Sequence, residues 1–101
     1  MEAINLYSGS ATAGAKTAVF VPNLQKDSLN RNNTGHVQMV VTSGVETPAV
    51  KIEGSSDGTN WIDVATGVNT TTGFHIAVFP YIRANVTTAG TSTNIAVYLI
   101  L

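Results

Sequence analysis

Six carboxylates and two histidines are the side chains of this 101-residue chain that can act as general acids, general bases or metal ligands. A glycosidase needs two facing carboxylates, and a serine hydrolase needs a Ser-His-Asp arrangement. No G-x-S-x-G nucleophile elbow occurs in the sequence. Asp57 is explained by the turn in which it lies, and Glu53 by an outward position on a strand. The sequence therefore predicts a protein that is not an enzyme.

A metal or cofactor site is not predicted either. His36 and His75 fall on the polar faces of their strands and are expected to be surface histidines, since a lone imidazole needs a second ligand or base. Asp57 and Asp63 flank Trp61, but this spacing matches no calcium-binding loop. Cysteine is absent, and no glycine-rich phosphate loop precedes a helix. We expect no bound metal and no cofactor.

Trp61 and Arg83 each allow more than one interpretation. The single tryptophan either caps the core, with its N–H group reaching a loop carbonyl, or forms a stacking platform for a sugar ring. Arg83 lies among apolar neighbours. It either lies flat across the sheet as a buried hydrogen-bond donor, pairs with Glu53 or Asp63 on a neighbouring strand, or contacts a partner subunit.

Two elements must position these side chains. The segment Ala49–Gly54 alternates between apolar and polar residues, and so does the segment that begins at Trp61. Asp57-Gly58 lies between them, and this dipeptide favours a hairpin turn because glycine adopts a positive φ without steric cost. We therefore predict a β-hairpin here.

In the rest of the chain, apolar and polar residues also alternate with a period of two rather than 3.6 residues. These alternating segments are separated by turns rich in Gly, Ser, Thr and Asn. One buried and one exposed face is typical of antiparallel sheets. The sequence predicts one all-β domain over residues 1–101, an antiparallel β-sandwich or small jelly roll of about eight strands. The expected strands are Ala3–Tyr7, Lys16–Val21, Gly35–Ser43, Ala49–Gly54, Trp61–Ala65, Gly73–Phe79, Tyr81–Thr87 and Asn94–Leu101.

The longest loop is expected at Pro22–Thr34. It is either a contact loop for a partner or a long crossover between sheets that has no partner. Within it, Asn23–Asn30 is either a short helix or irregular. The polar residues that make it a candidate contact loop are Lys26, Asp27, Arg31, Asn32 and Asn33.

Charge is scarce in this chain. Charged residues make up 11%, the net charge is −1, and Thr, Ser, Asn and Gly together account for 39 residues. The basic residues are scattered, so binding to nucleic acid is not expected. The apolar run at the C-terminus has seven residues, too few to cross a membrane, and no signal peptide is expected at the start. A neutral surface favours association with other protein surfaces.

The pattern S-x-D-G-x-x-W within Val50–Val64, followed by P-Y-I-R-A-N-V and a terminal apolar strand, resembles small β-sandwich virion proteins of tailed bacteriophages. The motif residues are Asp57, Gly58, Trp61, Tyr81 and Arg83. The likeness covers Val50 to Leu101, and the first half of the chain only by its strand pattern. It implies a capsid decoration or cement protein in the virion, assembled in the host cytoplasm. It also implies a homo-oligomer, with a trimer as our expectation, that contacts the major capsid protein or neighbouring virion subunits.

A similar pattern occurs in discoidin-type sandwiches, which bind glycans or membranes. This resemblance is weaker, because the chain is shorter than those domains. It implies a second function, a glycan-binding module displayed on a virion or tail. The candidate stacking groups are Trp61, Tyr7, Tyr81 and Tyr98.

Overall fold

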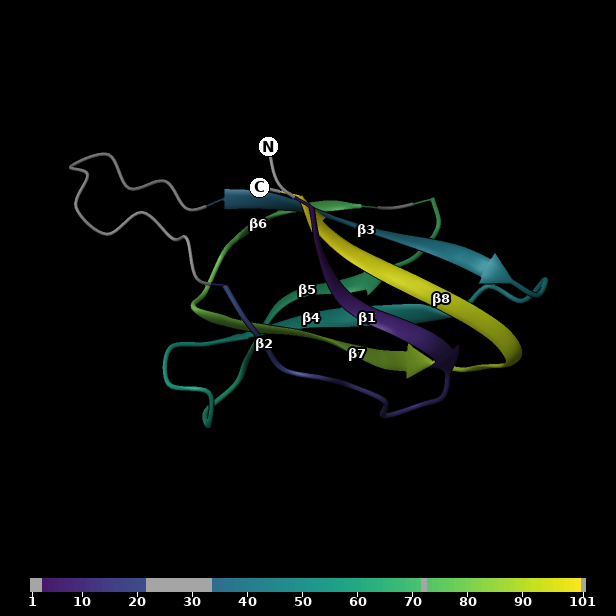
Figure 1. Cartoon of the computed structure of the whole chain (residues 1–101), viewed down its shortest axis with the longest axis horizontal. Helices are drawn as coiled ribbons and strands as arrows, with labels where there is room; N and C mark the ends of the chain where they lie inside the picture. Colours follow the sequence, from purple (N-terminus) through teal and green to yellow (C-terminus); the bar gives the residue numbers. More distant parts are fainter. Residues whose placement is uncertain (1–2, 22–33, 72, 101) are drawn as a thin grey trace.

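The structure is a computed structural model that describes residues 3–21, 34–71 and 73–100 (Figure 1). These residues form eight strands and no helix, so the predicted all-β fold is confirmed. The strands are β1 (Ala3–Ala11), β2 (Val19–Phe20), β3 (Thr34–Ser43), β4 (Ala49–Ser55), β5 (Ile62–Val68), β6 (Phe74–Ala77), β7 (Tyr81–Thr88) and β8 (Gly90–Ile100).

The strands form two four-stranded sheets that pack as a β-sandwich. The first sheet has the order β1-β8-β3-β6, and the second has the order β2-β7-β4-β5. Neighbouring strands are antiparallel in both sheets. The chain passes from the second sheet to the first through Ala89 alone, between β7 and β8. Figure 1 shows the paired strands β1 and β8 running diagonally across the second sheet.

The core lies between the inner faces of the two sheets, and it follows the predicted alternation. In β3, Val37 and Met39 are buried while Gln38 between them is exposed. The same alternation is seen in β7, where the buried residues are separated by half-buried polar ones. The predicted core positions that are fully or almost fully buried include Val50, Ile52, Ile76, Val78, Ile82, Ala84, Val86, Ile95, Val97 and Leu99.

Several strand boundaries differ from the prediction. The first strand was expected to end at Tyr7, but β1 continues to Ala11 because its backbone pairs with the long strand β8. For the same reason β8 begins at Gly90 rather than Asn94. β2 is shorter than predicted, and Lys16 makes only an isolated bridge to Asn85. Pairing with a neighbouring strand overrides the local turn preference of Ser, Thr and Gly. β5 covers Ile62–Val68 and β6 covers Phe74–Ala77, while β3, β4 and β7 each differ from the prediction by one residue at one end.

The predicted contact loop lies outside the described residues, apart from its last residue, Thr34, which begins β3. The same applies to the alternative of a short helix at Asn23–Asn30. The candidate contact residues Lys26, Asp27, Arg31, Asn32 and Asn33 are therefore not placed.

Candidate functional site

Three motif residues, Trp61, Tyr81 and Arg83, lie on the outer face of the second sheet, while Asp57 and Gly58 lie in the turn between β4 and β5. Arg83 in β7 pairs in register with Glu53 in β4, and Glu53 pairs with Asp63 in β5. Tyr81 lies two residues before Arg83 on β7, so both side chains point to the same face. Three adjacent strands thus bring together side chains that are far apart in the sequence.

Four charged side chains form what we call the ion-pair cluster: Lys51, Glu53, Asp63 and Arg83. Arg83 Nε donates a hydrogen bond to Glu53 Oε1 over 2.6 Å. Lys51 Nζ lies 3.3 Å from Glu53 Oε2 and 3.3 Å from Asp63 Oδ1. The predicted pairing of Arg83 with Glu53 is confirmed. The cluster contains two positive and two negative groups, so it has no net charge.

Glu53 is the buried centre of this cluster, with 7% of its surface exposed. Burial acts to raise the pKa of its carboxyl group, but the hydrogen bonds and charges of Arg83 and Lys51 outweigh burial and lower that pKa. Hydrogen bonds to Glu53 and Asp63 raise the pKa of Lys51. A carboxylate held ionised by two cations is a weak general base, so the arrangement is suited to holding strands together rather than to proton transfer.

Trp61 packs against the ion-pair cluster instead of the core. The guanidinium carbon of Arg83 lies 4.1 Å from the centre of the Trp61 ring, a cation–π contact. Trp61 is half-buried and does not belong to the hydrophobic core cluster. The prediction that Trp61 caps the core is therefore wrong. The reason is that Arg83 points outward, which provides a flat partner for the ring on the outer face.

The connection between β4 and β5 is the predicted turn, and its hydrogen bonds are internal. Gly58 has a φ of 80°, the positive value predicted for it. Asp57 Oδ1 accepts hydrogen bonds from the backbone N–H groups of Thr59 at 2.8 Å and Asn60 at 2.9 Å. The Ser55 hydroxyl oxygen accepts from the Gly58 N–H at 2.8 Å. The Asp57 carboxylate is thus occupied by its own turn.

The same hydrogen bonds determine the acidity of Asp57. The backbone N–H groups of Asn60 and Thr59, together with the Asn60 and Ser55 side chains, hold the pKa of the Asp57 carboxyl well below its usual range. Asp57 therefore stays ionised at neutral pH as a structural acceptor.

We expect the free energy of unfolding to fall as the pH drops below about 5, because the pKa of both Glu53 and Asp57 is lower in the folded state than in the unfolded chain. A lowered pKa adds stability that is fully present above the unfolded pKa of about 4 and is lost as the pH falls through the folded pKa. Urea unfolding of the wild type between neutral and acidic pH measures this loss.

The double variant Glu53→Gln, Asp57→Asn should lose much less stability on acidification than the wild type. Each substitution removes a carboxylate whose pKa is lower in the folded state than in the unfolded chain. An unchanged pH dependence in this variant would contradict the assignment of acid sensitivity to these two carboxylates.

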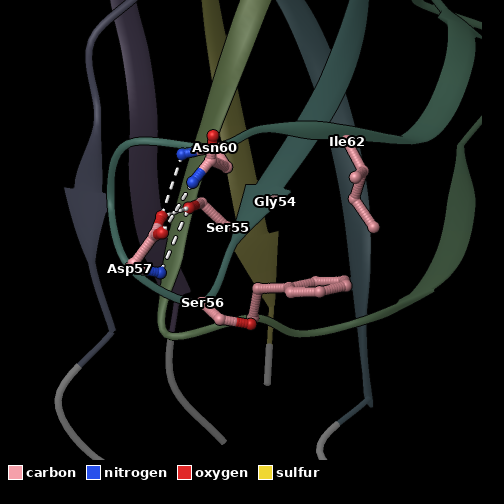
Figure 2. A pocket seen from close by; sticks show the side chains of 7 residues that line it. Gly54, Ser55, Ser56, Asp57, Asn60 and Ile62 are labelled. Carbon is pink, nitrogen blue, oxygen red and sulfur yellow. Dashed lines mark hydrogen bonds between the residues drawn. The ribbon is translucent and has the colours of Figure 1, made fainter.

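A pocket of about 150 Å³ lies beside the turn, next to Gly54 and Phe79. Figure 2 shows Ser55, Asp57 and Asn60 at its polar end and Ile62 at the opposite end. Ligand pockets generally have ~300–1,000 Å³. The polar groups at this end already bond to one another, so the pocket is poorly suited to a small-molecule substrate.

Gly54 makes room for the Phe79 ring in this pocket. A Cβ atom at position 54 would lie 2.5 Å from Phe79 Cδ1 and 2.7 Å from Cγ. We expect Gly54→Ala to lower the free energy of unfolding by about 1–3 kcal/mol, since the ring must leave its place. Combining it with Phe79→Leu should cost less than the sum of the two single variants, as measured by urea unfolding. Simple additivity would contradict the proposed clash.

The four candidate stacking aromatics do not form one platform. Tyr81 lies on the second sheet, where its ring centre is 5.3 Å from that of Phe20. Tyr7 and Tyr98 belong to β1 and β8 of the first sheet. Only Trp61 and Tyr81 are therefore associated with the outer face of the second sheet.

His36 and His75 lie on the outer face of the first sheet, as predicted from the alternation. The sequence did not show that they are neighbours. They face each other across β3 and β6, and their ring centres are 5.0 Å apart. No local signal reveals this, because the register between two distant strands depends on the whole sheet.

Two further features of the site were also missed. Lys51 bridges Glu53 to Asp63, and Phe20 packs beside Tyr81. The spacing of Lys51 and Glu53 on one strand face was the available signal for the first. The sequence contains no signal for the contact of Phe20, since its neighbour Tyr81 comes from a strand that is distant in the chain.

The described residues contain no cluster of three or more His, Cys, Asp or Glu side chains arranged to hold a metal ion. Nor do they include a helix long and apolar enough to cross a membrane. Comparison of the chain with protein families, curated proteins and solved structures finds no significant match.

Proposed function

We propose that this chain is a non-enzymatic structural protein of a bacteriophage particle, a capsid decoration or cement subunit that binds to itself and to neighbouring virion subunits. The proposal starts from the resemblance of the S-x-D-G-x-x-W and P-Y-I-R-A-N-V segments to such proteins. The observation that carries it further is the character of the surface.

That surface is neutral and partly apolar. Two of the five Lys and Arg residues and two of the six Asp and Glu residues neutralise one another in the ion-pair cluster. Large apolar side chains are exposed at separate places: Phe20 at 55%, Ile62 at 56% and Val45 at 96%. A weakly charged surface favours association with other subunits.

The test has two parts. Light scattering behind a sizing column at micromolar concentration should give three times the 10.5 kDa mass of the chain, in keeping with a trimer. The purified protein should then cosediment with particles of the phage that encodes it and saturate at a fixed stoichiometry. Failure to bind those particles at any ratio would overturn the proposal, whereas a monomer that binds them would remove only the trimer.

A glycan-binding module is the second candidate, and the exposed Phe20 beside Tyr81 favours it over catalysis. An aromatic side chain on an outer sheet face can stack on a sugar ring. Trp61 is the only tryptophan and lies on the same sheet, so its fluorescence reports on ligands there. A glycan array without hits, with unchanged fluorescence on addition of sugars, would remove this candidate.

A further inference from the structure

We propose that His36 and His75 together bind a divalent transition-metal ion of the Zn²⁺, Ni²⁺ or Cu²⁺ class on the outer face of the first sheet. The two residues are direct partners in the antiparallel register of β3 and β6. Directly opposed side chains of an antiparallel pair have Cβ atoms ~4.5–5.5 Å apart, which lets two imidazoles reach one ion. They are the only histidines of the chain.

The separation of the two rings suits chelation. A ligating imidazole nitrogen lies ~2.0–2.1 Å from Zn²⁺, which places the centre of its ring ~3.2 Å from the ion. Two ring centres 5.0 Å apart then subtend an angle of ~100° at the ion. This value lies between those of adjacent ligands in octahedral and tetrahedral sites. The ring planes are inclined at 60° to one another, so binding requires the rings to turn until one nitrogen of each faces the ion.

The imidazoles are available for a ligand. His75 is exposed and His36 half-buried, and neither makes a hydrogen bond or ion pair with the described residues. Their neighbours on this face are neutral, so no cation of the described residues competes with the ion. These neighbours are Thr34, Gln38, Ala77 and Ile100.

Gly73 contributes the space that His36 occupies. A Cβ atom at position 73 would lie 2.8 Å from the Val37 carbonyl oxygen and 2.9 Å from His36 Nε2, so the ring lies close against the backbone just before β6. Imidazole nitrogen is the ligand preferred by ions of this class, and water would complete their coordination.

Binding would join an edge strand to the body of the sheet. β6 has four residues and lies at the sheet edge, hydrogen-bonded to β3. An ion shared by His36 and His75 would cross-link these two strands. Because the paired geometry exists only in the folded chain, the ion should stabilise the fold.

The experiment uses the chain without a polyhistidine tag at pH 7.5. Isothermal titration with Ni²⁺ and Zn²⁺ should show one ion per chain. Tm should rise by about 5 °C or more once the free ion exceeds its dissociation constant about tenfold. In ¹H–¹⁵N spectra, Cu²⁺ should first broaden the signals around residues 36 and 75.

His36→Gln and His75→Gln each remove one ligand and should weaken binding about 100-fold, because the second imidazole acts at high effective concentration. Gln38→Ala, on the same face, should keep the wild-type affinity. The metal-free Tm of each variant shows that it is folded. Undiminished affinity in either histidine variant, or no heat and no Tm shift up to millimolar Ni²⁺ and Zn²⁺, would overturn the proposal.

Discussion

Ile52→Ala is expected to lower the free energy of unfolding by about 3–5 kcal/mol, the upper part of the range for such core truncations. Ile52 lies in the centre of β4 and is fully buried. Its register partners are Ala84 in β7 and Ala65 in β5. Both neighbours are small, so neither can move in to fill the cavity that the lost atoms would leave. Urea unfolding followed by tryptophan fluorescence measures the loss.

Ile62→Ala is the matched control, because it removes the same atoms from the same sheet. Ile62 in β5 is 56% exposed. Its truncation should change the free energy of unfolding by no more than about 0.5 kcal/mol. Equal losses for the two isoleucine variants would show that Ile52 is not at the centre of the core. A domain of this size has ~5–15 kcal/mol of stability in total, so Ile52→Ala takes a large share of it.

Glu53→Ala should be the most costly substitution on the outer face of the second sheet, lowering the free energy of unfolding by about 3 kcal/mol. Removing one partner of a buried ion pair costs ~3–5 kcal/mol, because the remaining charge keeps its burial and loses its partner. Arg83 would lose its 2.6 Å hydrogen bond while its side chain stays 18% exposed. Its contact with Trp61 remains, which places the loss at the lower end of that range.

Asp63→Ala provides the comparison, since Asp63 pairs with the same Lys51 but its side chain is 57% exposed. Exposed ion pairs contribute ~0.2–1 kcal/mol, so this variant should stay within about 1 kcal/mol of the wild type. Unfolding in urea at neutral pH, under identical salt, compares the two. If Glu53→Ala cost no more than Asp63→Ala, the buried pairing of Glu53 with Arg83 would not hold in solution.

The double variant Glu53→Leu, Arg83→Leu separates the loss of the ion pair from the cost of leaving Arg83 buried without a partner. It removes both charges at once, so no charge remains buried without a partner. Replacing a buried ion pair with apolar residues is often neutral. We therefore expect the double variant to be more stable than Glu53→Ala. This outcome would mean that the cost of Glu53→Ala comes mainly from the charge of Arg83 that is left without its partner.

The strand pattern was predictable because the alternation of side chains is a local property. Val37, Gln38 and Met39 show by themselves which face is buried, and the structure agrees. The Asp57-Gly58 turn was predictable for the same reason, since a positive φ depends on the glycine itself. The pairing of Arg83 with Glu53 was one of several alternatives, and the register of β4 with β7 places these two residues opposite each other.

The sequence by itself thus determined that this protein is built of short antiparallel strands, which face of most strands is buried, and where the hairpin between β4 and β5 lies. Only the tertiary structure decided which strands are neighbours. In that structure Trp61 packs against the guanidinium of Arg83 rather than in the core, and His36 lies beside His75. The physical reason is that periodicity acts over a few residues, whereas the contacts on an outer sheet face depend on the register of strands that are distant in the chain.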